Sequence, residues 1–410
     1  MLARLPSSVS GNKAFAVSLL CIVIVFMSYA AHAQTFSVLH TFTGGGDGAD
    51  PLAGLTMDRA GNLYGTAYGG GINSPAGTVF KLRRSGSGWL LNPLYEFSQQ
   101  GAGGMNPSGG VVFGPDGTLY GTTVNGGSGY GVVYRLQPPS SACEAAFCYW
   151  TETVLYRFAA APDGNLPTGN LIFDPAGNIY GTTEAGGSFG YGTVFKLTHS
   201  GSNWTGQVLY SFASGQDGDD PTDGVVMDSA GNLYGTTPYG GINHCQNSCG
   251  IVFELTPSGS GWTESVLYRF QGQPDGQRPY AGLIIDSLGN LYGATYEGGN
   301  GGGTVFELSP SGNSWNYAIL YSLTGSENGP FARPAMDSAG NLYDSTIIPG
   351  TIFKLTPSGG AWTYTDLHDF SGNDGMVPRG SVTLDGQGNL FGTTSMGGAD
   401  AQGTAWELTP

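Results

Sequence analysis

A heptapeptide pattern of the form Gly-Asn-Leu-Tyr-Gly-Thr-Thr recurs along this chain of 410 residues. Its seven copies begin at Gly61, Gly117, Gly177, Gly231, Gly289, Gly340 and Gly388. They follow one another at intervals of about 50 to 60 residues, and a repeat of this size must share a core with its neighbours because it cannot bury an apolar face alone. The repeat therefore predicts either a solenoid or a propeller.

The composition favours an all-β chain. Gly accounts for 72 residues and aromatic residues for 12%, and no segment after the N-terminus shows the apolar period of a helix. Each Gly cluster separates alternating apolar segments and recurs in register, which is typical of turns between strands rather than of disorder.

The first 33 residues have the features of a secretory signal. Arg4 and Lys13 precede an apolar run over 14–31, and Ala31-His32-Ala33 matches an A-x-A cleavage site. We expect cleavage after Ala33 and a secreted, periplasmic or cell-surface protein. An uncleaved anchor stays open as the alternative, because about 18 apolar residues can span a bilayer. The chain ends at Pro410 directly after a predicted strand, and we expect no C-terminal anchor.

The charge argues against a nucleic-acid partner. The formal net charge is -16, and the 14 Lys and Arg residues are scattered, whereas phosphate binding needs a basic stripe. Removal of the signal segment makes the charge more negative still, because its charged residues are both basic.

The stretch from Gly224 to Phe270 shows how one repeat is built. Turn signals divide it into four expected strands, at 225–228, 232–237, 250–256 and 262–270. Asp228 and Gly231 form the turn between the first two strands, and Pro257 begins the turn between the last two. The four strands therefore predict an antiparallel meander, as in a propeller blade.

The two ends of the chain decide between a solenoid and a propeller. The last repeat has three expected strands, at 381–385, 389–394 and 403–408, and lacks a fourth. Residues 37–42, Ser-Val-Leu-His-Thr-Phe, repeat the pattern of that fourth strand. We therefore predict an all-β, seven-bladed β-propeller over 34–410, a single domain and a monomer, in which the N-terminal strand completes the last blade.

Six Trp residues occupy one repeat position, six residues before the Tyr or His of each outer strand. They are Trp89, Trp150, Trp204, Trp262, Trp315 and Trp362. We expect them to pack between blade edges, with a row of ligand-stacking rings as the alternative.

Three motifs resemble the GloVer tandem-repeat family of exported bacterial proteins. They are Leu-Tyr-Gly-Thr-Thr at 233–237, Gly-Gly at 240–241 and the segment 250–255, and the resemblance covers nearly the whole mature chain. It implies a repeat architecture and export. The family carries no assigned activity, so the resemblance implies no catalytic residues.

The propeller prediction sorts the loops onto two faces. Loops from the second to the third strand, and loops leading into the next blade, open on the same face, where we expect a ligand. Aromatic side chains concentrate in the first of these loop families: Tyr68, Tyr130, Phe189, Tyr191, Tyr239 and Tyr296. Such rings suit carbohydrate or peptide recognition. The alternative is that each ring folds over its own Gly-rich loop.

The loops that lead into the next blade carry the motif Asp-Gly-x-x-Pro. It begins at Asp47, Asp163, Asp217, Asp275 and Asp374. We expect Asp to bond the local backbone, Gly to turn the chain and Pro to start a strand, and we therefore expect no cofactor. Calcium is the alternative, because Asp217, Asp219 and Asp220 crowd one loop and hard cations need several oxygen ligands.

Four cysteines remain after cleavage, in two local pairs. In an exported protein, Cys143 with Cys148 and Cys245 with Cys249 predict two disulfides that close loop tips. Ser188 lies in a Gly-x-Ser-x-Gly pattern, but no helix follows it, so the context of a nucleophile elbow is missing.

These observations favour a non-catalytic binding scaffold with an extracellular glycan or protein as its partner. Two alternatives stay open. One is a polysaccharide-active hydrolase or lyase with acids at the tunnel mouth, and the other is a purely structural surface protein.

Overall fold

A computed structural model describes residues 34–100, 103–140, 148–201, 203–241, 249–259, 261–325, 329–348 and 350–410. Within it, Gln34–Pro410 form one compact unit. The predicted signal peptide and its cleavage site lie outside the described residues. No helix formed by the described residues is long and apolar enough to cross a membrane.

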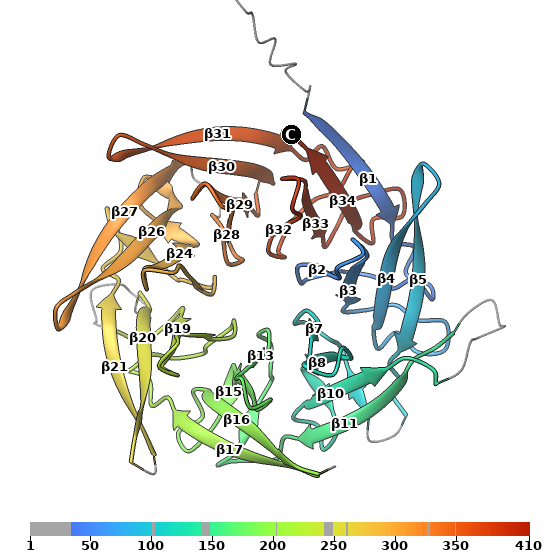
Figure 1. The fold of residues 1–410 in the computed structure, drawn as a ribbon, viewed down its shortest axis with the longest axis horizontal. Coiled ribbons are helices and arrows are strands. Elements are labelled where there is room, and N and C mark those ends of the chain that lie inside the picture. Colours follow the sequence, from blue (N-terminus) through green and yellow to red (C-terminus); the bar gives the residue numbers. More distant parts are fainter. Residues whose placement is uncertain are drawn as a thin grey trace, which may run out of the picture. The chain divides into compact units, whose positions relative to one another are not determined.

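Seven four-stranded antiparallel sheets are arranged in a ring around a common centre (Figure 1). The prediction of a seven-bladed β-propeller is therefore confirmed. We number the blades 1 to 7 in the order of their innermost strands.

The innermost strands surround the centre of the ring. They are β2 (Thr56–Met57), β7 (Val112–Phe113), β13 (Ile172–Phe173), β18 (Val226–Met227), β23 (Ile284–Ile285), β28 (Ala335–Met336) and β32 (Thr383–Leu384). The second strands are β3 (Leu63–Ala67), β8 (Leu119–Thr123), β14 (Ile179–Thr183), β19 (Leu233–Thr237), β24 (Leu291–Thr295), β29 (Leu342–Thr346) and β33 (Leu390–Thr394). All residues of these second strands are buried.

The third and fourth strands form long outer hairpins. The third strands are β4 (Thr78–Ser85), β10 (Val132–Gln137), β16 (Thr193–Ser200), β20 (Ile251–Ser258), β26 (Gly301–Ser311), β30 (Thr351–Ser358) and β34 (Thr404–Thr409). The outermost strands are β5 (Gly88–Glu96), β11 (Thr151–Arg157), β17 (Asn203–Ser211), β21 (Gly261–Arg269), β27 (Ser314–Thr324), β31 (Ala361–Asp369) and, for blade 7, β1 (Thr35–Thr41).

The N-terminal strand closes the ring. β1 pairs antiparallel with β34, from Thr35 opposite Thr409 to Thr41 opposite Thr404. Phe42, which follows β1, is fully buried and packs against Phe80 of blade 1, with ring centroids 5.1 Å apart. Residues 37–42 thus complete the last blade as predicted, in a strand that begins two residues earlier.

The recurring heptapeptide forms the turn and strand that hold each blade together. In blade 4, Asp228 Oδ1 accepts hydrogen bonds from the backbone N–H groups of Ala230 and Asn232, and its Oδ2 accepts bonds from the side chains of Asn232 and Tyr234. Gly231 adopts a φ of 89° in this turn, a conformation that side-chain-bearing residues rarely adopt. The heptapeptide is therefore conserved between repeats for a structural reason.

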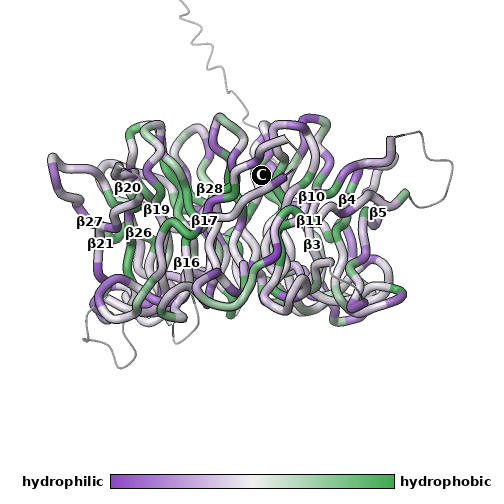
Figure 2. Tube along the Cα trace, turned by 90° about the horizontal axis from the view of Figure 1, so that it is seen from below, coloured by the Kyte–Doolittle hydropathy of each residue, from purple (hydrophilic) through white to green (hydrophobic). Residues whose placement is uncertain are grey.

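The hydrophobic core lies between neighbouring blades. Tyr234 and Val252 of blade 4, for example, pack in one cluster with Phe306 and Leu308 of blade 5. Figure 2 shows apolar segments at mid-height of the ring, between two faces formed by loops. Each blade therefore buries its apolar surface only by contact with the next, as the repeat length predicts.

Candidate functional site

Two families of loops lie on one face of the ring. One family connects the second strand of a blade to the third, the other leads into the blade, and the two pair with each other through backbone hydrogen bonds. In blades 2, 3 and 5 they form short ribbons, β6 (Gly104–Met105) with β9 (Asn125–Gly126), β12 (Gly164–Asn165) with β15 (Ala185–Gly186), and β22 (Gly276–Gln277) with β25 (Glu297–Gly298). In the other four blades a single bridge replaces the ribbon, such as Asp219 with Tyr239. The candidate ligand face is thus a continuous layer of paired loops.

The Asp of the Asp-Gly-x-x-Pro motif anchors these loops to the outermost strand. Asp217 Oδ2 accepts hydrogen bonds from the Tyr210 hydroxyl at 2.9 Å and from the Ala213 backbone N–H at 3.0 Å. A Cβ on Gly218 would lie 2.5 Å from Thr237 Oγ1, so the next position has room only for Gly. The motif has the structural role expected from the sequence.

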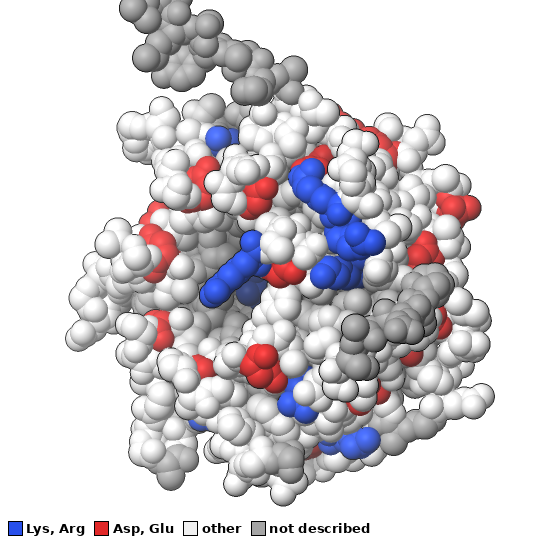
Figure 3. Space-filling model, turned by 45° about the vertical axis from the view of Figure 1, so that its right-hand side comes forward, with Lys and Arg blue, Asp and Glu red and all other residues white. Residues whose placement is uncertain are grey.

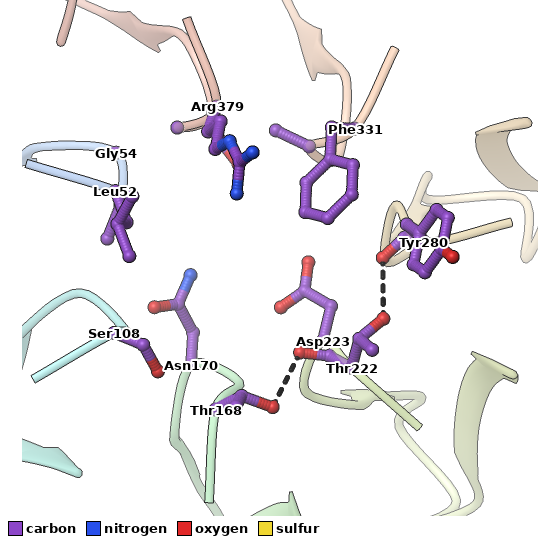
Figure 4. Close-up of a pocket in the computed structure, with 15 residues that line it drawn as sticks. Leu52, Gly54, Ser108, Thr168, Asn170, Thr222, Asp223, Tyr280, Phe331 and Arg379 are labelled. Carbon is purple, nitrogen blue, oxygen red and sulfur yellow. Dashed lines mark hydrogen bonds between the residues drawn. The ribbon is translucent and has the colours of Figure 1, made fainter. Parts of the chain in front are cut away.

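A Pro recurs in all seven of these loops, and the residue after it points toward the centre of the ring and differs from blade to blade. We call these seven residues the mouth ring: Leu52, Ser108, Thr168, Thr222, Tyr280, Phe331 and Arg379. Together with the residues that follow them, they line a hollow of about 90 Å³ (Figure 4).

Asp223, which lines the hollow, forms an ion pair with a residue of another blade. Arg333 of blade 6 donates to both carboxylate oxygens of Asp223 in blade 4, at 3.1 and 2.7 Å. Asp223 also accepts the backbone N–H groups of Gly224 and Gly282. Desolvation opposes ionisation of Asp223, but the charge of Arg333 and these hydrogen bonds outweigh it, so the pKa of Asp223 is lowered. Both side chains are therefore charged, and the pair has no net charge.

Aromatic side chains cluster on one side of the hollow, where Tyr280 and Phe331 line it. Phe331 stacks on Tyr280, with ring centroids 4.8 Å apart and an interplanar angle of 22°. Tyr296 packs edge-on against both rings, and the hydroxyls of Tyr239 and Tyr280 are 2.7 Å apart. We call Tyr239, Tyr280, Tyr296 and Phe331 the aromatic wall.

Arg379 lies beside this wall with its guanidinium group over the Phe331 ring, 5.5 Å from the ring centroid. Its side chain is exposed. Among the described residues it forms neither a hydrogen bond nor an ion pair. On the opposite side, Asn170 Oδ1 accepts the Gly110 backbone N–H at 2.8 Å, which leaves its amide NH₂ directed into the hollow (Figure 4). The open polar groups at the mouth are therefore hydrogen-bond donors.

The five tyrosines that were predicted to bind a ligand do not lie together. Tyr239 and Tyr296 lie in the aromatic wall, whereas Tyr68, Tyr130 and Tyr191 belong to blades 1 to 3 and lie outside it. Tyr130 packs against the core cluster between blades 2 and 3, and Tyr191 is 40% exposed beside Phe189 at 61%. A ligand role for these three residues stays a prediction.

Tyr280, Phe331 and Arg379 were not predicted from the sequence. They lie in the loops that lead into a blade, whereas the aromatic residues predicted to bind a ligand lie in the loops between the second and third strands. The detectable signal is that the position after the recurring Pro is variable in an otherwise regular repeat.

The acidic loop of blade 4 holds its carboxylates in different environments. Asp219 Oδ2 accepts the Ser214 hydroxyl at 3.0 Å. Asp220 has a φ of 58°, and burial, a hydrogen bond with Asp219 and the charges of Asp219 and Glu184 raise its pKa to about 7. No three His, Cys, Asp or Glu side chains of the described ranges form a group suited to a metal ion. Calcium binding by Asp217, Asp219 and Asp220 stays a prediction.

Both predicted disulfides include a residue outside the described ranges. Cys143 and Cys245 are those residues, while their predicted partners, Cys148 and Cys249, are described. The pairing therefore stays a prediction.

The repeated Trp residues pack between blades, as expected. Trp262 of blade 4 lies against Tyr180 of blade 3, and Trp315 of blade 5 against Tyr234 of blade 4, with ring centroids 6.4 and 5.8 Å apart. Trp204 also packs against the core cluster between blades 2 and 3. It lies beside His199, with ring centroids 5.1 Å apart, and lines a groove of about 500 Å³ between the same blades.

Figure 3 shows acidic residues scattered over a mostly uncharged surface, with basic side chains gathered in a short row and a second group near the hollowed middle of this view.

Comparison with solved structures supports the fold and leaves the activity open. Virginiamycin B lyase from Staphylococcus aureus is similar at 15% identity and a TM-score of 0.53, over 92% of this chain and 99% of that chain. The PQQ-bound aldose sugar dehydrogenase from Streptomyces coelicolor is similar at 14% identity and a TM-score of 0.48, over 92% and 98% of the two chains. At 15% identity the likeness to virginiamycin B lyase shows a shared fold alone. No protein with a curated function matches the sequence.

The sequence profile of the Gloeobacter/Verrucomicrobia repeat matches four overlapping segments, residues 25–171, 95–263, 144–349 and 242–410. These segments extend over the whole propeller, in agreement with the resemblance of its repeats to the GloVer pattern. The chain belongs to the Gloeobacter/Verrucomicrobia repeat family.

Proposed function

We propose that this protein is an exported, non-catalytic scaffold that binds a carbohydrate at the mouth ring. The observation that carries the proposal is the aromatic wall beside open hydrogen-bond donors. Sugars present apolar C–H faces that pack on aromatic rings and oxygen atoms that accept hydrogen bonds, and binding sites commonly combine apolar walls with a few placed polar groups.

A carbohydrate fits this face better than a peptide. Peptides often bind by adding a strand to an exposed sheet edge. Here the loops around the mouth pair with each other, as β22 does with β25, and this pairing occupies backbone groups that an added strand would need. Peptide binding is therefore the competing outcome of the test.

Binding of a glycan panel to the purified protein, followed by isothermal titration with each hit, tests the proposal. Phe331→Ala should weaken glycan binding about tenfold, because it removes a ring worth about 1.4 kcal/mol of contact. Phe189→Ala provides the matched control, since Phe189 is an exposed ring on the same face but outside the aromatic wall. Equal losses in both variants, or binding of peptides alone, would contradict the proposal.

Export is part of the proposal and rests on the signal-like segment 1–33. Mass spectrometry of the protein from its native host should give a mature N-terminus at Gln34. A cell-associated chain that retains residues 1–33 would favour the uncleaved anchor.

A second candidate, a polysaccharide-active enzyme, is favoured by Asp220. A carboxyl group with a pKa of about 7 can serve as a general acid at neutral pH, and Glu184, whose pKa is raised by burial, lies near enough to influence it. Turnover of a bound glycan, abolished by Asp220→Asn, would favour this enzyme over the scaffold.

A further inference from the structure

We infer that the mouth ring selects acidic carbohydrates, because Arg379 pairs with a carboxylate of the sugar. The inference rests on the proposed function and adds the chemical class of the ligand. The charge of Asp223 in the hollow is neutralised by Arg333 through two hydrogen bonds. Arg379 has no such partner among the described residues. The mouth therefore carries one uncompensated positive charge in a chain of formal charge -16.

The position of Arg379 leaves the N–H groups of its guanidinium group available to a ligand. The central carbon of its guanidinium group lies 5.5 Å from the centroid of the Phe331 ring, and Phe331 in turn stacks on Tyr280. This contact leaves the N–H groups of Arg379 without a hydrogen-bond partner among the described residues. Those N–H groups match the two oxygens of a carboxylate in a bidentate geometry. Figure 4 shows the guanidinium group directed toward the centre of the hollow.

Two further hydrogen-bond donors lie on the side of the hollow that faces Arg379. The Asn170 amide NH₂ is directed inward, because Asn170 Oδ1 is held by Gly110. The Ser108 hydroxyl is buried without a hydrogen-bond partner among the described residues. Both groups can donate to an oxygen of the ligand, and a buried hydroxyl gains from a partner.

The volume of the hollow limits what enters it. A dry cavity of about 150 Å³ holds one benzene molecule, so a hollow of about 90 Å³ admits a group smaller than a sugar ring. A carboxylate and the carbon that carries it fit this limit, while the sugar ring stays above it, against the aromatic wall. We therefore infer recognition of an acidic residue at a chain end.

The aromatic wall disfavours an acidic peptide such as triglutamate. The carboxylates of such a peptide could reach Arg379, but the peptide has no sugar ring to pack on Tyr280 and Phe331. A uronate at the end of a glycan brings both groups, a carboxylate for Arg379 and a ring for the aromatic wall.

A matched pair of ligands tests the inference. Trigalacturonate and neutral galactotriose differ at C6 of each of their three residues, where the first has a carboxylate and the second a hydroxymethyl group. Both are titrated into the purified protein by calorimetry, with triglutamate as the peptide arm. We expect trigalacturonate to bind at least tenfold more tightly than galactotriose, and this difference to shrink at high salt because the charge pair is exposed to solvent.

Three variants test whether Arg379 causes the preference for trigalacturonate. Arg379→Met should abolish the preference for trigalacturonate, and Arg379→Lys should restore part of it, because Lys keeps the charge but not the bidentate geometry. Arg59→Met is the control, since Arg59 is an exposed Arg in the turn between β2 and β3, on the other face. Equal binding of the two sugars, an unaffected Arg379→Met variant or tighter binding of triglutamate would overturn the inference and leave glycan binding itself standing. Binding of neither sugar to the wild-type protein would contradict the proposed function as well.

Discussion

The imidazole ring of His368 lies parallel to the phenyl ring of Phe36, with ring centroids 3.7 Å apart and an interplanar angle of 3°. Phe36 belongs to the N-terminal strand β1, and His368 belongs to β31 of blade 6. Tyr268 and Tyr317 make the same stack between blades 4 and 5, at 3.8 Å and 9°. The junction closed by the N-terminal strand thus repeats a contact found between blades that are consecutive in sequence.

Deletion of residues 34–43 should therefore open the ring. The deletion removes β1 and the fully buried Phe42, and loss of a buried Phe side chain alone costs about 3–5 kcal/mol. Urea unfolding should show at least this decrease in the free energy of unfolding. Leu288→Ala is the control, because Leu288 is 79% exposed and its loss should cost less than about 0.5 kcal/mol. An unchanged midpoint for the deletion would contradict the closure.

A buried carboxyl group in blade 6 should make stability depend on pH. Asp344 stands where the other repeats have Gly, and it is 1% exposed. Its Oδ1 accepts the Ser345 backbone N–H, whereas Oδ2 has no partner in the described part of the chain. Burial raises the pKa of Asp344 well above its usual value. The folded protein therefore retains a proton that the unfolded chain releases near pH 4.

The free energy of unfolding should consequently fall as the pH rises from the unfolded pKa toward the folded pKa of Asp344. Asp344→Asn removes this dependence. At neutral pH it should raise the free energy of unfolding by more than about 1 kcal/mol, because folding of the wild-type protein then requires uptake of a proton by Asp344. Urea unfolding between pH 4.5 and 8 measures both effects, with exposed Asp400→Asn as control. The same slope in wild type and Asp344→Asn would exclude Asp344 as the cause.

The ion pair of Asp223 and Arg333 should have the opposite pH dependence. Because the pKa of Asp223 is lowered, its stabilising effect is present above the unfolded pKa and is lost as the pH falls through the folded pKa. Arg333→Met leaves a buried carboxylate unpaired and should cost about 3–5 kcal/mol. The double variant Asp223→Leu with Arg333→Met should recover much of this loss in unfolding experiments. Additive losses would argue against direct pairing.

Asp217 offers a direct test between a turn and a calcium site. Asp217→Ala removes hydrogen bonds from Tyr210 and Ala213, and we expect a loss of about 1–3 kcal/mol in the free energy of unfolding. Millimolar CaCl₂ should change the melting temperature no more than NaCl of equal ionic strength. A rise specific to Ca²⁺ that Asp217→Ala abolishes would instead identify a calcium site.

Most of the fold could be predicted because it depends on residues that recur. In blade 4 the expected strands at 232–237 and 262–270 correspond to Leu233–Thr237 and Gly261–Arg269. The Asp turn and the Gly positions signal their roles in every repeat, since each satisfies a backbone requirement that all blades share. The boundaries differ by one or two residues, because strand ends depend on hydrogen bonds to neighbouring loops.

The candidate site was only partly predictable because it depends on what the repeats do not share. Tyr239 and Tyr296 stood out as loop aromatics, but their partners Tyr280 and Phe331 come from other loops. The ring brings these loops together, and no sequence spacing reports that proximity. The pairing of Arg333 with Asp223, 110 residues apart, was unpredictable for the same reason.

A crystal structure of the protein with bound trigalacturonate would show where the ligand lies. We predict that a terminal carboxylate lies within hydrogen-bond distance of the Arg379 guanidinium group, with the sugar ring above the hollow against the aromatic wall. Density for the sugar in the groove beside Trp204, or on the exposed loop around Tyr191, with an empty mouth ring, would contradict recognition of the sugar carboxylate by Arg379.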